Sequence, residues 1–123
     1  MFSDTLLDHF QHPRNAGDLP GATARVEVSN PVCGDILQLA AILDDHRIRE
    51  ARFLCRGCSA SIASASLLTE LMQGRELSEL DAMRPELLAQ SLGGLPHASF
   101  HAAQLAVDAL QALLHQLRQT SQH

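Results

Sequence analysis

Four side chains that can bind a metal ion lie at three separated points of this chain. Cys33 and Asp35 share one short segment, Cys58 follows a glycine, and His101 lies near the start of a C-terminal helical segment. Thiolate, imidazole and carboxylate groups are the ligands that transition metals and iron–sulfur centres use in proteins. The combination of these donor types raises the hypothesis of a metal or iron–sulfur site.

The first point is the segment Asn30-Pro31-Val32-Cys33-Gly34-Asp35, which has the composition of a tight loop between two strands. Proline and glycine favour a turn from which a side chain can point out of the fold, as a metal ligand requires. Cysteine is also a common buried apolar residue, so Cys33 alone fits a ligand and a packed thiol about equally well. Asp35 alone would be interpreted as a turn residue.

The second point is Cys58, which lies between Gly57 and a helix expected to begin near Ser59. A helix N-terminus supplies unpaired amides and a partial positive charge, which favour thiolate over thiol. Thiolate is the form of cysteine that binds metal or attacks sulfur. A buried structural thiol is the alternative interpretation.

Cys55 and Cys58 form a Cys-x-x-Cys pair, a spacing used by zinc sites and by dithiol exchange. One such pair without a second is a weak signal. Cys55 also falls at the end of an expected strand, on the same face as Phe53. We therefore favour a packed strand residue for Cys55, with a ligand role as the alternative.

The third point is His101, expected in the first turn of the last helix. A lone histidine there is more often solvated or hydrogen-bonded than a ligand. His97 is four residues earlier, but Pro96 argues against a shared helical face. The other C-terminal histidines, His115 and His123, are expected on the surface.

The elements that must position these residues follow from hydrophobic period and turn residues. Ser3 has the character of an N-cap for a helix with Leu6, Leu7 and Phe10 at helical spacing, and Pro13 ends that helix. From residue 24 to about 54 the period changes towards two, which predicts one strand around 26–28, one over 36–43 and one over 48–54.

Short turns between these strands predict an antiparallel meander, and helices follow it. One helix is expected over Ser59 to Met72, a short one with a capping box at Ser78, another starting at Pro85, and the longest from Ser99 to about Arg118. The sequence therefore predicts an α+β fold, a three-stranded antiparallel sheet packed against several helices. The 123 residues suit a single domain, 1–123.

Composition argues against nucleic-acid-binding, membrane-spanning and secreted disulfide-rich proteins. The net charge is −5, with nine Arg and no Lys, and no basic patch stands out, which argues against nucleic acid as the main partner. No apolar run approaches the roughly 18 residues of a membrane span, and no secretory signal is recognised. Three cysteines without an export signal indicate reduced or metal-binding thiols in the cytoplasm rather than a disulfide framework.

Motifs in a fixed order along almost the whole chain resemble the U-type iron–sulfur cluster scaffold proteins, the IscU/NifU N-terminal family. The resemblance rests on Asp8-His9-Phe10, Pro13-Arg14-Asn15, Gly17, Cys33-Gly34-Asp35, Ala51-Arg52-Phe53, Gly57-Cys58, Ser61-Ile62-Ala63-Ser64-Ala65-Ser66, Leu95-Pro96, His101 and Asp108-Ala109.

The resemblance implies a non-enzymatic carrier with the IscU/NifU-like fold. Such a scaffold takes sulfur from a cysteine desulfurase and iron from an iron donor, builds a [2Fe–2S] cluster and passes it to recipient apo-proteins. Carried over to this chain, the implied ligands are Cys33, Asp35, Cys58 and His101. The family site also commonly holds zinc.

The chain departs from the family pattern at the third cysteine, which falls on Ala102. Alanine has no donor atom, so this position can neither bind iron nor carry a persulfide. The loss weakens sulfur transfer more than metal binding, because two thiolates must then both hold metal and accept sulfur. Cys55, which falls where the family often has another residue, is a candidate for a displaced third thiol.

A second departure concerns Leu95-Pro96-His97-Ala98-Ser99, which keeps only the front of the family's Leu-Pro-Pro-Val-Lys chaperone-recognition motif. Docking to the dedicated scaffold chaperone is therefore in doubt. The segment Gly93-Gly94-Leu95 also lacks the insertion of the zinc-binding branch related to the sulfur-mobilising system.

The leading hypothesis is an iron–sulfur cluster assembly scaffold or carrier that binds a metal ion or a [2Fe–2S] cluster. The first alternative is a zinc-bound sulfur acceptor that stimulates a cysteine desulfurase. The second is a degenerate paralogue that binds a partner and holds no cluster.

Overall fold

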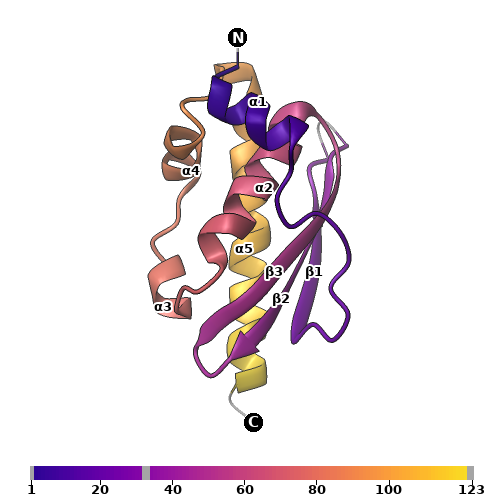
Figure 1. The fold of residues 1–123 in the computed structure, drawn as a ribbon, viewed down its shortest axis with the longest axis vertical. Coiled ribbons are helices and arrows are strands. Elements are labelled where there is room, and N and C mark those ends of the chain that lie inside the picture. Colours follow the sequence, from indigo (N-terminus) through magenta and orange to yellow (C-terminus); the bar gives the residue numbers. More distant parts are fainter. Residues whose placement is uncertain (1, 32–33, 122–123) are drawn as a thin grey trace.

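The computed structural model describes residues 2–31 and 34–121, and a three-stranded antiparallel sheet runs through it (Figure 1). The strands are β1 (Ala24–Ser29), β2 (Ile36–Asp44) and β3 (Arg47–Arg56), in the order β1-β2-β3. The predicted α+β class and the antiparallel meander are confirmed. β3 extends one residue before and two residues after its predicted bounds.

The strand register sets what lies at one end of the sheet. Ile36, the first residue of β2, pairs with Arg56, the last residue of β3. Residues just before β2 are therefore opposite residues just after β3, which brings Asp35 alongside Gly57. Antiparallel pairing thus joins two loops that are separated by more than twenty residues of sequence.

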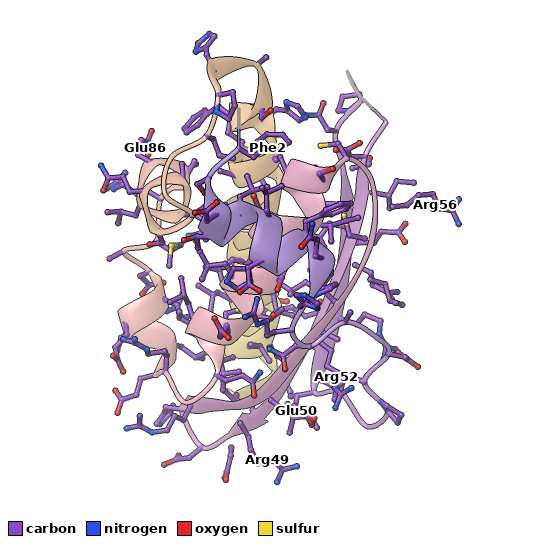
Figure 2. All side chains as sticks on the ribbon, turned by 45° about the horizontal axis from the view of Figure 1, so that its top comes forward. Phe2, Arg49, Glu50, Arg52, Arg56 and Glu86 are labelled. Carbon is purple, nitrogen blue, oxygen red and sulfur yellow. The ribbon has the colours of Figure 1, made fainter. Side chains whose placement is uncertain are left out.

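Two long helices cover one face of the sheet. The helix α2 (Ser59–Met72) packs on β3, and α5 (Phe100–Ser121) packs on β1 and β2 (Figure 1). They also contact each other, and the core lies between them and the inward side chains of the strands, such as Leu37, Leu39 and Phe53. Side chains on the other side include arginines of β3, and Figure 2 shows Arg56 projecting away from the ribbon.

The remaining helices are short. They are α1 (Asp4–Gln11), α3 (Leu77–Leu80), α4 (Pro85–Ser91) and the 3₁₀ turn η1 (His97–Ser99) that leads into α5. The bounds predicted for α2 and the start predicted at Pro85 are confirmed. The capping box predicted at Ser78 is misplaced: Glu76 is the N-cap of α3, Glu79 completes the box, and Ser78 lies inside the helix.

Ser3 caps α1 as predicted, because its hydroxyl accepts a hydrogen bond of 3.0 Å from the Leu6 amide. The apolar spacing of this helix does not describe its buried face. Leu7 and Phe10 are each 37% exposed, whereas Leu6 and His9 are buried. A polar side chain can replace an apolar one there because it has hydrogen-bond partners on α2.

Those partners form a polar network between α1, the segment after it, and α2. His9 Nδ1 lies 2.8 Å from Ser66 Oγ, and the Arg14 amide donates to the same hydroxyl at 2.9 Å. His9 Nε2 is 3.7 Å from Glu70 Oε1. The network fixes the segment that runs on to β3, where the Gly17 amide donates to the Phe53 carbonyl at 2.8 Å.

We expect the stability of the fold to fall as pH is lowered through the titration of His9. Burial lowers the pKa of His9, and the Arg14 charge adds to this, against smaller opposing effects of Glu70 and Asp8. The folded pKa therefore lies below the unfolded value of about 6.5, and the unfolded chain takes up a proton that the folded chain resists. The contribution of neutral His9 to the free energy of unfolding is fully present above pH 6.5 and declines below it.

Urea unfolding between pH 7.5 and 5.5 measures this dependence. His9→Gln should flatten it, whereas His115→Gln, at an exposed position of α5, should leave it unchanged. Equal pH slopes in the parent and in His9→Gln would contradict the assignment to His9.

Among the described residues, none of the helices is both long and apolar enough to cross a bilayer.

Candidate metal centre

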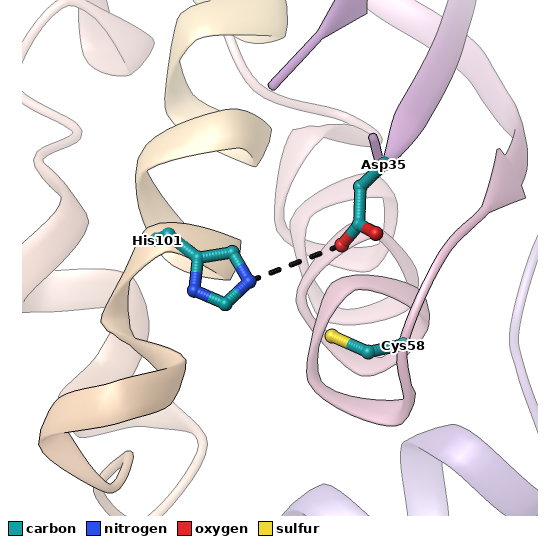
Figure 3. Close-up of side chains that lie close together, drawn as sticks. All are labelled: Asp35, Cys58 and His101. Atoms are coloured by element: carbon teal, nitrogen blue, oxygen red, sulfur yellow. Dashed lines mark ion pairs between the residues drawn. The ribbon is translucent and has the colours of Figure 1, made fainter. Parts of the chain in front are cut away.

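Three of the donor residues meet at one end of the sheet. Asp35 immediately precedes β2, Cys58 is the N-cap of α2, and His101 is the second residue of α5 (Figure 3). One donor atom from each of them lies within 4.8 Å of the donor atoms of the other two. The strand register and the packing of α2 against α5 therefore produce a cluster that no local sequence motif contains.

Asp35 is held by the loop that precedes it. Gly34 has a φ of 77°, in the left-handed region that glycine adopts at no steric cost, and its amide donates to the Asn30 carbonyl at 2.7 Å. The Asn30 amide in turn donates to the Asp35 carbonyl at 2.9 Å. These bonds close the loop and turn the Asp35 side chain towards the start of α2, where it is only 6% exposed.

Gly57 provides the space for the Asp35 carboxyl group. A Cβ atom built on Gly57 would lie 2.7 Å from Asp35 Cγ and 2.9 and 3.0 Å from its two oxygens. Real Cβ atoms do not approach other atoms this closely. A residue without a side chain is therefore needed before Cys58, because the Asp35 carboxyl group occupies the space that a Cβ atom would take.

Ser61, in the first turn of α2, completes the seat of the carboxylate. Its hydroxyl donates to Asp35 Oδ2 at 2.5 Å, and the hydroxyl oxygen Ser61 Oγ also lies 3.4 Å from Cys58 Sγ. Buried carboxylates are stable when hydrogen-bonded, and this bond serves that need. Ser61 is itself only 2% exposed.

Cys58 is exposed and occupies the N-cap position of α2 without making a side-chain capping bond. Serine, threonine, aspartate and asparagine are the residues that stabilise this position best. The position leaves the thiol at the end of the helix whose first amides have no partner within the helix. The chain therefore carries a reactive group at a position where a better helix cap would add stability.

His101 presents Nε2 to the cluster. Its Nδ1 lies 3.1 Å from the Ala98 carbonyl, which can only accept, so Nδ1 carries the proton of the neutral ring and Nε2 has the free lone pair. Nε2 is 4.0 Å from Asp35 Oδ2 (dashed line in Figure 3). That separation is too long for a hydrogen bond. The backbone bond is the kind of partner that orients metal-binding histidines.

The donor set suits a metal ion. Ligand atoms of a tetrahedral zinc site, bonded at about 2.0–2.3 Å, lie roughly 3.3–3.8 Å apart. Any two donor atoms of Asp35, Cys58 and His101, which lie no more than 4.8 Å apart, would need to come closer by about 1.5 Å at most. The three residues thus form a possible metal site with one oxygen, one sulfur and one nitrogen donor.

Comparison with known proteins identifies the family of this chain. Residues 1–122 match the family described as the NifU-like N terminal domain. The chain belongs to this family. The resemblance to the IscU/NifU N-terminal family found in the sequence is therefore confirmed.

Iron-sulfur cluster assembly scaffold proteins are similar in sequence to this NifU-like chain over most of its length. It is 40% identical over 111 residues to the iron-sulfur cluster assembly scaffold protein IscU 1 of Archaeoglobus fulgidus, covering 90% of this chain and 72% of that one. It is 38% identical over 117 residues to IscU of Haemophilus influenzae, covering 92% of both chains. The NifU-like N-terminal structure from Brucella abortus has the same fold, with a TM-score of 0.78, 18% identity and coverage of 95% and 94%.

Two cysteines of this NifU-like domain remain to be placed. Cys33, the remaining residue of the four named from the sequence, lies outside the described residues. Cys55 packs against the hydrophobic core, and burial, with smaller effects of Asp35 and Cys58, raises the pKa of its thiol to about 12. The interpretation of Cys55 as a packed strand residue is confirmed, since its thiol is poorly ionised and it is not a member of the Asp35, Cys58 and His101 group.

Ala102, where the family pattern has a cysteine, lies in the hydrophobic core and is 1% exposed. A cysteine restored here would lie in the first turn of α5, where the helix amides alone would favour a thiolate that can accept persulfide. The structure instead encloses this position, and an apolar enclosure raises the pKa of a thiol and makes it a poor nucleophile.

We therefore expect Ala102→Cys to add no rapidly reacting thiol. Titration of the native protein with a disulfide reagent should give the same fast-reacting count in the parent and in the variant. The additional thiol should react only after unfolding. One extra fast-reacting thiol in the native variant would contradict this and would place position 102 within reach of sulfur transfer.

Ser61 and Gly57 were not assigned to the site from the sequence. Both occur in the motifs that carry the family resemblance, but nothing in their spacing shows which side chain they serve. Their partner is Asp35, more than twenty positions earlier, and only the strand register brings it to them.

Proposed function

We propose that this chain is an iron–sulfur cluster assembly scaffold that binds its metal through Cys33, Asp35, Cys58 and His101. The observation that carries the proposal is the convergence of an oxygen, a sulfur and a nitrogen donor at one end of a NifU-like domain. Its cargo is a [2Fe–2S] cluster, and zinc is an alternative occupant because thiolate, imidazole and carboxylate all bind zinc.

The proposed role is that of a carrier and not of an enzyme. Sulfur would come from a cysteine desulfurase and iron from an iron donor, and the finished cluster would pass to recipient apo-proteins in the cytoplasm. The exposed thiol of Cys58 supports contact with such partners, because a group that receives sulfur must be reachable.

Docking to a dedicated chaperone is proposed to be weak or absent. His97, Ala98 and Ser99 replace three residues of the recognition motif, and they form the 3₁₀ turn that leads into α5. A binding titration of labelled chaperone with this protein tests the proposal, and micromolar affinity or better would contradict it.

Anaerobic purification and reconstitution with iron and sulfide test the function itself. We expect about one zinc ion or one [2Fe–2S] cluster per chain, since the donors form one site. The chain has no Trp or Tyr, so near-ultraviolet as well as visible absorption of the reconstituted protein would come from the cluster. Absence of both metals before and after reconstitution would contradict the scaffold function.

The same experiment addresses the alternative of a zinc-bound sulfur acceptor. That function predicts a colourless zinc protein that stimulates a cysteine desulfurase. A visible chromophore that transfers to an apo-ferredoxin supports the scaffold instead.

A further inference from the structure

The hydroxyl of Ser61 touches two of the proposed ligands at once. It donates to Asp35 Oδ2 at 2.5 Å and lies 3.4 Å from Cys58 Sγ. An ionised carboxylate can only accept, so the single hydroxyl proton goes to Asp35 and a lone pair of Oγ faces the sulfur. Ser61 is 2% exposed, so water has little access to replace the hydroxyl.

These contacts limit how the short side chain of Asp35 can rotate, because it has neighbours on two sides. Gly57 lies against the carboxyl group on one side, and His101 Nε2 lies 4.0 Å from Oδ2 on another. The oxygen bonded by Ser61 is the one that faces His101. Rotation of the carboxylate away from His101 would therefore break the Ser61 bond.

We propose that Ser61 is a positioning residue that holds the Asp35 carboxylate and the Cys58 thiol facing His101 before metal arrives. The inference rests on the proposed function and adds a residue that donates no ligand atom. Residues that orient ligands lower the reorganisation needed on binding, and their loss typically costs about 10- to 100-fold in metal affinity.

Zinc affinity of the full chain, measured by competition with a chelating dye, tests the proposal. Ser61→Ala should bind zinc about 10- to 100-fold more weakly than the parent. Ser64→Ala is the matched control: Ser64 lies one turn further along α2, is 0% exposed, and its hydroxyl has no hydrogen-bond partner among the described residues. This control should bind zinc as the parent does.

A second comparison separates positioning from a general loss of structure. With Asp35→Ala as the starting protein, the additional change Ser61→Ala should cost clearly less zinc affinity than it costs in the parent, because the group that it orients is gone. An equal cost in both backgrounds would overturn the proposal. Ser61→Thr, which keeps the hydroxyl, should recover most of the affinity that Ser61→Ala loses.

Should Ser61→Ala fail to fold, the double variant with Asp35→Ala removes both partners of the bond and leaves no unpaired carboxylate. Its zinc affinity should then equal that of Asp35→Ala within about threefold, and a loss beyond the roughly 10-fold lower limit for ligand-orienting residues would overturn the proposal. A parent protein that binds neither zinc nor a cluster refutes the proposed function. A parent that binds zinc no better than a folded Ser61→Ala variant refutes only the role of Ser61.

Discussion

Replacing Cys58 by serine should remove most of the metal affinity while leaving the fold as stable as before, or slightly more stable. The loss should exceed the roughly 10- to 100-fold that follows removal of a ligand-orienting partner, because a thiolate ligand itself is lost. The gain arises because Cys58 is the N-cap of α2 and makes no capping bond. Serine can make that bond, for a gain of up to about 1 kcal/mol.

Cys55→Ser is the matched control and should show the opposite pattern. Cys55 is half-buried and packs against the core, so a hydroxyl there should cost about 1 kcal/mol of unfolding free energy or more. Zinc affinity should stay within about threefold of the parent, well below the loss expected for a ligand. Chelator competition measures the zinc affinity of both variants, and urea unfolding measures their free energies of unfolding. Loss of metal in Cys55→Ser would instead identify Cys55 as the replacement for the cysteine missing at Ala102.

Gly57→Ala should both destabilise the fold and weaken the metal site. The added methyl group would lie within 3.0 Å of the Asp35 carboxyl group, so the carboxylate must leave its position beside Ser61. A buried carboxylate that loses its hydrogen bond costs about 1–3 kcal/mol. The backbone of Gly57 does not lie in the left-handed region, so alanine is otherwise allowed there and the expected cost comes from the close approach alone.

The control for this prediction is the same substitution in an Asp35→Ala background. Without the carboxyl group the methyl group has space, so Gly57→Ala should then cost less than about 1 kcal/mol. Gly21→Ala provides a second comparison, since Gly21 has a φ of 77° and nothing within 4 Å of a Cβ. It should cost the roughly 1–2 kcal/mol of left-handed backbone strain and leave zinc affinity unchanged. A cost for Gly57→Ala that persists without Asp35 would contradict the explanation.

Local patterns were sufficient for most of the secondary structure. Alternating residues such as Val26 and Val28 predicted the strands, and the bounds predicted for α2 and the start predicted for α4 at Pro85 match the structure. These signals work because a turn or a helix end is decided by residues within a few positions of each other. The predicted cap at Ser78 was misplaced for the same reason, since Glu76 and Glu79 form an equally local box two residues earlier.

The buried face of α1 could not be obtained in this way. Helical spacing marked Leu6, Leu7 and Phe10, but the helix buries Leu6 and His9. The choice depends on Ser66, which lies 57 positions away and hydrogen-bonds the imidazole. Hydrophobic periodicity contains no information about such a distant partner.

By itself, the sequence determined the α+β class, the family, and the four residues that could bind a metal. These conclusions depend only on the composition and the order of the residues, which need no knowledge of contacts in space. Only the tertiary structure decided that Asp35, Cys58 and His101 converge within 4.8 Å, that Cys55 belongs to the core, and that Gly57 and Ser61 seat the carboxylate. The reason is physical: these contacts join β2, β3, α2 and α5 through strand register and helix packing, which are set by the burial of the whole core and not by any one segment.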